Sequence, residues 1–205
     1  MKHSMLIPGL LALCSGTASA QAAGNCVPND DQVAVFEHGG SDKRGLGRCE
    51  TLDVKEYPDL AKTKLGKGAM SSIKVGKNVY AVVCNQPDFK GACEVHDKDD
   101  GDLRDNPTVK NDTAASVKVM QGKVCSPKGG QKVDIKWTNR TKSPVRVNWI
   151  GFDCTEESNQ RLIKPGDVYD GGTFVGHVFR VREEGTTKNL GLIYVTPHNV
   201  SQDIR

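Results

Sequence analysis

Apolar and polar residues alternate with a period of two through much of residues 137–182. The alternation is clearest at two groups of apolar residues, namely Val145, Val147 and Trp149, and Phe174, Val178 and Phe179. A period of two is typical of β-strands with one buried face, and Pro165-Gly166 predicts a turn between the two groups. No long segment has convincing helical periodicity. The pattern therefore predicts an all-β protein.

Two short patterns recur within the first 121 residues at the same offset. Gly47-Arg48-Cys49-Glu50 returns as Gly91-Ala92-Cys93-Glu94, and Ser72-Ile73-Lys74-Val75 returns as Ser116-Val117-Lys118-Val119, each 44 residues later. Two matches at one offset indicate an internal duplication. Each unit is predicted to hold four short strands, which suits a Greek key. Two such units are expected to pack as an antiparallel β-sandwich.

Residues 32–121 resemble a βγ-crystallin double Greek key. The second unit has Phe89-Lys90-Gly91 after the run at 80–84, and it closes with Ala115-Ser116-Val117-Lys118-Val119. In the first unit Phe36 takes the place of the tyrosine-corner aromatic, and Gly39-Gly40 makes the turn. The resemblance implies a crystallin-like fold for a domain at residues 21–121.

Many microbial βγ-crystallins bind calcium through an Asn/Asp-Asn/Asp-x-x-Ser/Thr-Ser stretch. The second unit offers Asn111-Asp112-Thr113-Ala114-Ala115-Ser116, with Ala115 where a hydroxyl ligand is expected. The first unit, Lys67-Gly68-Ala69-Met70-Ser71-Ser72, has neither acidic nor amide position. Oxygen ligands suit a hard cation, so Asn111 and Asp112 remain as a degenerate calcium site. The alternative is an ordinary polar turn.

Glycine, proline and lysine gather in residues 122–132, which predicts a linker before a second domain at residues 133–205. That domain resembles the β domain of the von Hippel–Lindau tumour suppressor. The matching residues are Asn139-Arg140-Thr141, Val147-Asn148-Trp149-Ile150-Gly151-Phe152-Asp153, Leu162 with Pro165-Gly166, Thr173-Phe174-Val175-Gly176-His177 and Phe179-Arg180-Val181-Arg182. The resemblance implies a second antiparallel sandwich, which binds an extended peptide carrying hydroxyproline.

Three residues carry the pocket that this resemblance implies. Trp149 matches an aromatic of the cage, Thr173 matches a serine that binds the peptide hydroxyl, and His177 matches the pocket histidine. A hydroxyl and an imidazole can both bond a substrate hydroxyl, and unmodified proline would leave them unpaired. The residues themselves leave another interpretation open, in which Trp149 lies in the core and His177 holds a turn.

Four further residues belong to the same implied peptide site. Phe179 stands where the family has a second tryptophan, and Asn139 and Arg140 match the start of the module. Asn159 falls where the family has a pocket tyrosine. The family's helical domain, which recruits a ubiquitin ligase, has no counterpart in this sequence, so no such assembly is expected.

The first twenty residues have the pattern of a cleaved signal peptide. A basic start is followed by an apolar run at 5–13, too short to span a membrane, and by Ala18-Ser19-Ala20 before Gln21. We expect cleavage after Ala20 and a secreted or periplasmic protein. The alternative of a lipoprotein anchored at Cys14 is disfavoured because Leu13 stands where a small residue is needed.

Six cysteines follow the signal, namely Cys26, Cys49, Cys84, Cys93, Cys125 and Cys154. An even number in an exported protein predicts disulfides, and no pair has the C-x-x-C spacing of a metal site. Sequence alone does not choose among the 15 possible connectivities. We expect Cys125–Cys154 to tie the linker to the last domain, with Cys84–Cys93 and Cys26–Cys49 in the first.

Charge and motifs narrow the functional classes. A formal net charge of +3 without a basic cluster gives no case for nucleic acid, and no nucleophile, metalloprotease or phosphate-loop motif is present. We expect a non-enzymatic protein that binds a protein or peptide ligand, proline- or hydroxyproline-containing, with no membrane partner and no cofactor other than the calcium considered above. The competing hypothesis is a crystallin-like structural or stress protein, or a protease inhibitor.

Overall fold

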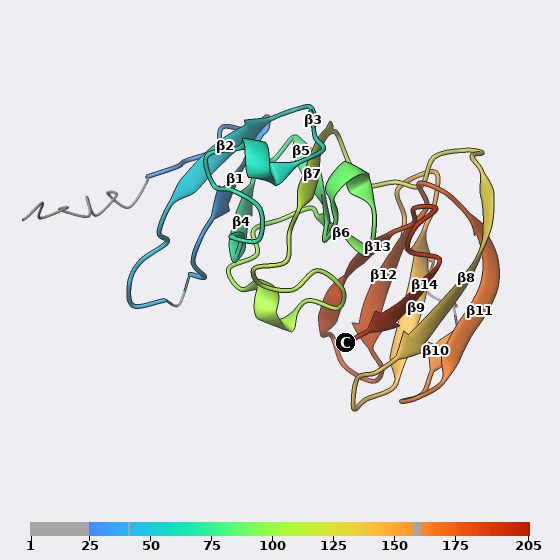
Figure 1. Cartoon of the computed structure of the whole chain (residues 1–205). Coiled ribbons are helices and arrows are strands. Elements are labelled where there is room, and N and C mark those ends of the chain that lie inside the picture. The colour runs from blue at the N-terminus through green and yellow to red at the C-terminus, as the bar shows by residue number, and fades with distance from the viewer. Residues whose placement is uncertain (1–24, 41, 158–160) are drawn as a thin grey trace, which may run out of the picture.

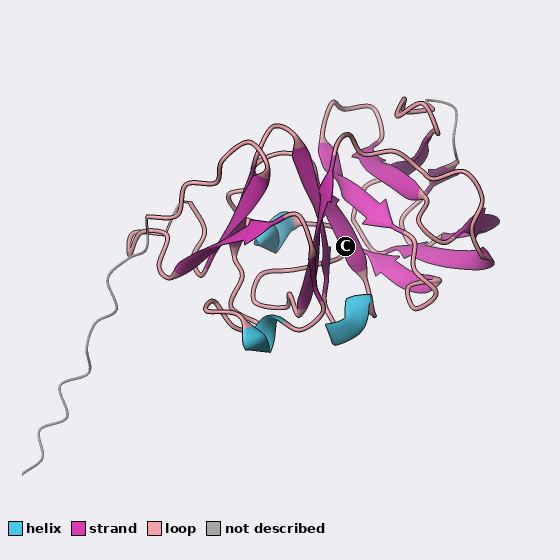
Figure 2. Cartoon of the chain, turned by 90° about the horizontal axis from the view of Figure 1, so that it is seen from above, coloured by secondary structure: helices cyan, strands magenta, loops and turns pink. Residues whose placement is uncertain are grey.

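The structure is a computed structural model that describes residues 25–40, 42–157 and 161–205. These residues form strands and three short 3₁₀ turns, with no α-helix among them (Figure 2). The all-β prediction is confirmed. No helix in the described ranges is long and apolar enough to cross a membrane. The leader expected at 1–20, with Cys14, lies outside these ranges.

The N-terminal unit, residues 25–121, contains two Greek-key motifs that exchange strands with each other. Its elements are β1 (Gln32–Phe36), β2 (Cys49–Asp53), β3 (Glu56–Tyr57), η1 (Leu60–Lys62), β4 (Ser72–Val75), β5 (Val79–Cys84), η2 (Pro87–Phe89), β6 (Cys93–His96), η3 (Leu103–Asp105) and β7 (Ser116–Gln121). Strands β2, β1 and β4 form one sheet, and β6, β5, β7 and β3 lie together in another. The repeats found in the sequence coincide with β2 and β6, and with β4 and β7.

Each motif lends one element to the sheet of the other. Strand β3 of the first motif pairs with β7 of the second, and Asp100 of the second motif bridges Ile73 in β4 of the first. This exchange produces the double Greek key expected from the duplication. The two sheets enclose the first core, whose members include Val35, Leu52 and Val83.

The C-terminal unit, residues 132–205, is a second pair of sheets. Its strands are β8 (Lys132–Asn139), β9 (Val145–Ile150), β10 (Leu162–Ile163), β11 (Val168–Phe174), β12 (Val178–Glu183), β13 (Asn189–Tyr194) and β14 (Ser201–Ile204). Strands β11, β8 and β14 form one sheet, and the others lie opposite. Trp137 is fully buried in the second core between them. The expectation of purely antiparallel sheets is wrong at one place, because β14 pairs with β8 in parallel.

The two units share a sheet, which the sequence did not predict. Strand β13 pairs with β6, with Leu192 opposite Val95 and Ile193 opposite Glu94. The result is an eight-stranded sheet with the order β10-β9-β12-β13-β6-β5-β7-β3 that runs through the middle of the molecule (Figure 1). A third core fills the junction, and Val82, Val178 and Leu192 are among its buried members.

Strand β5 shows how the sequence accommodates this junction. All six of its residues are buried. Val79, Ala81 and Val83 face the first core, whereas Tyr80, Val82 and Cys84 face the third. A strand that is covered on both faces is expected to consist of consecutive apolar residues, and β5 has the sequence VYAVVC.

Three disulfides tie this framework together, and they pair as expected. Cys84 and Cys93 lie directly opposite each other in β5 and β6. Cys26–Cys49 fastens the start of the described chain to β2. Cys125–Cys154 joins the segment between β7 and β8 to the loop after β9. Such a set of bonds is typical of proteins in an oxidising compartment.

Candidate functional site

The C-terminal unit has an open cavity of about 260 Å³, here called the aromatic pocket. It lies where the ends of β9, β11 and β12 meet the turn after β11. Its lining residues are Trp149, Tyr169, Gly172, Thr173, Phe174, His177 and Phe179. The structure therefore brings together four of the residues predicted from the sequence, Trp149, Thr173, His177 and Phe179.

The polar part of the aromatic pocket is a hydroxyl–imidazole pair. Thr173 Oγ1 lies 3.0 Å from His177 Nδ1, and only 5% and 6% of the two residues are exposed. Gly176 has a positive φ of 91°, and the turn that it forms brings the His177 ring next to the Thr173 hydroxyl. Among the described residues, His177 Nε2 has no hydrogen-bond partner of good geometry. Burial lowers the pKa of His177, partly offset by the backbone of Pro127, so the ring is neutral at neutral pH.

Aromatic rings surround this pair. The rings of Trp149 and Phe174 each lie 5.3 Å from the His177 ring, measured between centroids. Phe152 lies edge-on to Trp149 at 4.9 Å. Phe152 is 47% exposed and Phe174 is 37% exposed, although both are large and apolar. Exposed aromatics around a buried polar pair are typical of a binding site rather than of a closed core.

Strand β11 forms one side of the aromatic pocket and is the edge of its sheet. In an antiparallel pair, the backbone groups of alternate residues face the partner strand. Val175 donates to Gln131 on the β8 side, and Asp170 O accepts from Arg161 on the other side. By this alternation the backbone groups of Gly172 face the open edge. An extended peptide can pair with such an edge.

Phe179 lines the aromatic pocket but mainly serves packing, whereas Asn139 and Arg140 lie outside the pocket. Phe179 is only 4% exposed, and its ring packs edge-on against Trp137 in the second core. Asn139 is fully buried and donates to the carbonyls of Ser143 and Ile163, so it holds a turn. Arg140 contacts Asp203 on the surface, away from the aromatic pocket.

Asn159 lies outside the described residues. Sequence reasoning gave no role to Phe152, Tyr169 or Phe174. The alternation at 168–174 indicates a strand, but it places Thr173 and Phe174 on opposite faces and so gave no sign that both would line one pocket.

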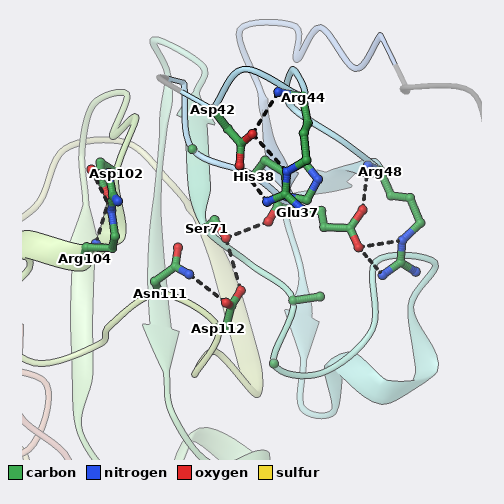
Figure 3. A pocket seen from close by; sticks show the side chains of 13 residues that line it. Glu37, His38, Asp42, Arg44, Arg48, Ser71, Asp102, Arg104, Asn111 and Asp112 are labelled. Atoms are coloured by element: carbon green, nitrogen blue, oxygen red, sulfur yellow. Dashed lines mark hydrogen bonds and ion pairs between the residues drawn. The ribbon is translucent and has the colours of Figure 1, made fainter.

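The N-terminal unit has a larger cavity of about 640 Å³, here called the charged pocket (Figure 3). Asn111 and Asp112 lie on its wall next to Ser71. Ser71 Oγ donates to the Glu37 carbonyl at 2.6 Å and lies 3.1 Å from Asp112 Oδ1. A hydroxyl group of the first unit, that of Ser71, therefore lies beside the carboxylate of Asp112 in the second. The sequence comparison within one unit could not detect this.

Arginines neutralise most carboxylates of the charged pocket. Glu37 pairs with Arg48, Asp42 with Arg44, and Asp102 with Arg104. The guanidinium of Arg44 holds the pKa of Asp42 far below its usual range. Asp112 has no arginine partner among these pairs, although Asn111 Nδ2 donates to its Oδ2 at 2.7 Å. No group of three metal-ligating side chains occurs in the part of the chain that the structure describes.

Calcium is therefore expected to bind weakly at Asn111 and Asp112. Asp112 is a carboxylate of this pocket without an arginine partner among the ion pairs described above, and Arg44 and Arg48 line the same pocket and would repel a cation. At about 1 mM calcium the midpoint of thermal unfolding should rise by less than about 1 °C, since binding at or below Kd adds little stability. Differential scanning calorimetry of the wild type and Asp112→Asn checks this. A rise of about 5 °C that disappears in Asp112→Asn would show a functional calcium site instead.

Comparisons with known proteins concern part of the chain. Solved structures similar to it include a βγ-crystallin domain from Flavobacterium johnsoniae, with 22% identity and a TM-score of 0.37 over 43% of this chain and 93% of that one. The N-terminal domain of protein S has 21% identity and a TM-score of 0.38, over 44% and 96%. A βγ-crystallin domain from Clostridium beijerinckii has 22% sequence identity and a TM-score of 0.37, over 43% of this chain and 97% of that one. No protein-family model and no curated protein matches the chain.

Proposed function

We propose that this chain is an exported, non-enzymatic protein that binds an extended proline- or hydroxyproline-containing peptide in the aromatic pocket. The C-terminal unit would be a module of the von Hippel–Lindau β-domain type, and the N-terminal unit its crystallin-like scaffold. The observation that carries the proposal is the buried Thr173–His177 pair inside a ring of partly exposed aromatics. Export is supported by the three disulfides.

The chemistry of the pocket fits a substituted pyrrolidine ring. Trp149 and Phe174 offer apolar faces on which such a ring can pack. Thr173 and His177 offer donor and acceptor atoms for a hydroxyl group on that ring. The open edge at Gly172 offers main-chain groups to the rest of the peptide. Affinity would come from the aromatics and the strand edge, and discrimination from the polar pair.

Replacing Thr173 with valine tests the discrimination. The change removes the hydroxyl and keeps the branched shape, so it should reduce the preference for hydroxyproline over proline by about tenfold. Phe174→Ala should weaken both peptides alike, because its ring contacts the pyrrolidine in either case. The measurement is isothermal titration calorimetry with three peptides that carry hydroxyproline, proline or alanine at one position.

Thr51→Val is the matched control, because Thr51 is exposed in β2 of the N-terminal unit. It should leave all three affinities unchanged. If folded Thr173→Val protein keeps the full hydroxyproline preference, the assigned role of the polar pair is wrong. If no peptide binds, the competing hypothesis of a crystallin-like structural protein or a protease inhibitor is favoured.

A further inference from the structure

The segment between β7 and β8, residues 122–131, is here called the linker segment. Its most buried residue is Ser126, of which 3% is exposed. Connecting segments normally run over the surface, so a buried serine in a segment rich in glycine, proline and lysine needs a reason. Ser126 does not line the aromatic pocket, but its contacts lead to two residues that do or that border it.

Ser126 joins two backbone segments through its side chain and its amide. Its Oγ accepts a hydrogen bond from the Val178 amide at 3.0 Å, and its own amide donates to the Gly151 carbonyl at 3.3 Å. Val178 directly follows His177 in the chain. Gly151 directly precedes Phe152. This one residue therefore ties the backbone beside His177 to the backbone beside Phe152, and the two rings lie 6.0 Å apart between centroids.

The residues on either side of this serine hold the same two backbone segments. Cys125 is bonded to Cys154 in the loop after β9. Pro127 packs closely against Gly176, where an added Cβ would lie 2.9 Å from the proline ring. Burial lowers the pKa of His177 and the backbone of Pro127 opposes this, so the linker segment lies within reach of the imidazole. Three consecutive residues thus support the turn after β11 and the loop after β9.

The linker segment is itself held at both ends. At its start, the Gly122 amide donates to the Asn78 carbonyl at 2.7 Å, and Val124 belongs to the third core. At its end, the Gln131 carbonyl accepts a hydrogen bond from the Val175 amide at 2.9 Å. A support that is fixed in this way can impose a geometry on the residues it contacts.

We propose that Ser126 is a positioning residue of the aromatic pocket, which holds His177 and Phe152 in the arrangement that a peptide requires. The inference rests on the proposed peptide site. Ser126 touches no ligand and acts through the backbones of Val178 and Gly151. Without its hydroxyl the buried Val178 amide would lose its acceptor, which is costly, so the start of β12 would shift and carry the His177 ring with it.

The test is an NMR comparison of the full mature chain and its Ser126→Ala variant, read at the His177 ring nitrogens without peptide. These resonances should move in the variant, because the ring changes its place relative to Thr173. Isothermal titration calorimetry with the hydroxyproline peptide should show an affinity about fivefold weaker, as for the loss of one hydrogen bond. A residue that serves stability alone would move neither reading.

Ser72→Ala is the matched control. Ser72 is also 3% exposed, and its Oγ donates to the His38 carbonyl at 2.7 Å. It lies in β4 of the N-terminal unit, in the sheet that the two units do not share. Thermal unfolding should show similar losses of stability in both variants, whereas the His177 resonances and the peptide affinity should stay as in the wild type in Ser72→Ala.

The positioning role is overturned if the His177 resonances of Ser126→Ala coincide with those of the wild type, or if Ser72→Ala moves them equally. Unchanged peptide affinity in folded Ser126→Ala protein also counts against this inference alone. A wild-type chain that binds none of the peptides counts against the proposed function instead, so the two failures are distinguishable.

Discussion

Replacing Trp137 with alanine is expected to lower the free energy of unfolding by about 3–5 kcal/mol. The side chain is fully buried in the second core. Its ring stacks on Tyr169 at 5.9 Å and meets Phe179 edge-on at 5.2 Å, and Nε1 donates to the Asn199 carbonyl at 3.3 Å. Truncation removes these contacts and leaves a cavity. Urea unfolding followed by circular dichroism measures the loss.

Trp149→Ala is the natural comparison for this change. Trp149 is only partly buried, and it packs at the margin of the second core beside the aromatic pocket. Its loss should cost about 1–2 kcal/mol of stability and should abolish peptide binding. Equal destabilisation by the two changes would mean that Trp149 serves the core, which is the alternative left open by the sequence.

Gly191→Ala is expected to cost about 3 kcal/mol or more, because it combines backbone strain with a clash. Gly191 has φ 146° at the junction between the units. A methyl group there would lie 2.5 Å from Glu94 Oε1 and 2.7 Å from Pro107 Cδ. Neither neighbour can move freely, since Glu94 is 2% exposed and accepts hydrogen bonds from Thr108 and Val109.

Gly185→Ala separates the two contributions to this effect. Gly185 also has a positive φ, 72°, but nothing lies within 4 Å of the added carbon. It should therefore cost only the strain, about 1 kcal/mol. Thermal unfolding of both variants provides the comparison. If Gly191→Ala unfolds no earlier than Gly185→Ala, the junction is looser than its packing indicates.

Local features of the fold were predictable because they leave a local signal. The alternation around Val147 and Phe179 marks strands, and the 44-residue repeat marks the two Greek keys. The sequence did not determine the disulfide pairing, although the place of Cys125 in the linker segment and of Cys154 in the unit that follows favoured one of the three bonds.

Contacts between distant segments left no such signal. The pairing of Val95 with Leu192 joins the sheets of the two units, and nothing in the sequence of either strand indicates a partner in the other unit. The parallel pairing of β14 with β8 is equally invisible, because the alternation of a strand does not reveal its direction.

The same distinction between local and distant contacts applies to the residues of the candidate sites. Thr173 and His177 are four residues apart in one turn, and the resemblance described in the sequence analysis predicted that both belong to one pocket. Ser71 and Asp112 come from different Greek keys, and only the crossing of the two motifs places them side by side. Phe152 reaches the aromatic pocket from the loop after β9, which has no periodic pattern to indicate its direction.

The shared sheet limits how this molecule can be divided for experiments. Cutting the chain between the units would strip β6 and β13 of the hydrogen bonds they exchange. Each fragment would then have an unpaired strand edge beside exposed apolar side chains of the third core, such as Val82 and Val178. Unprotected edges of this kind recruit other chains. Either half made alone is therefore prone to self-association, and the peptide binding proposed above is best assayed in the uncut protein.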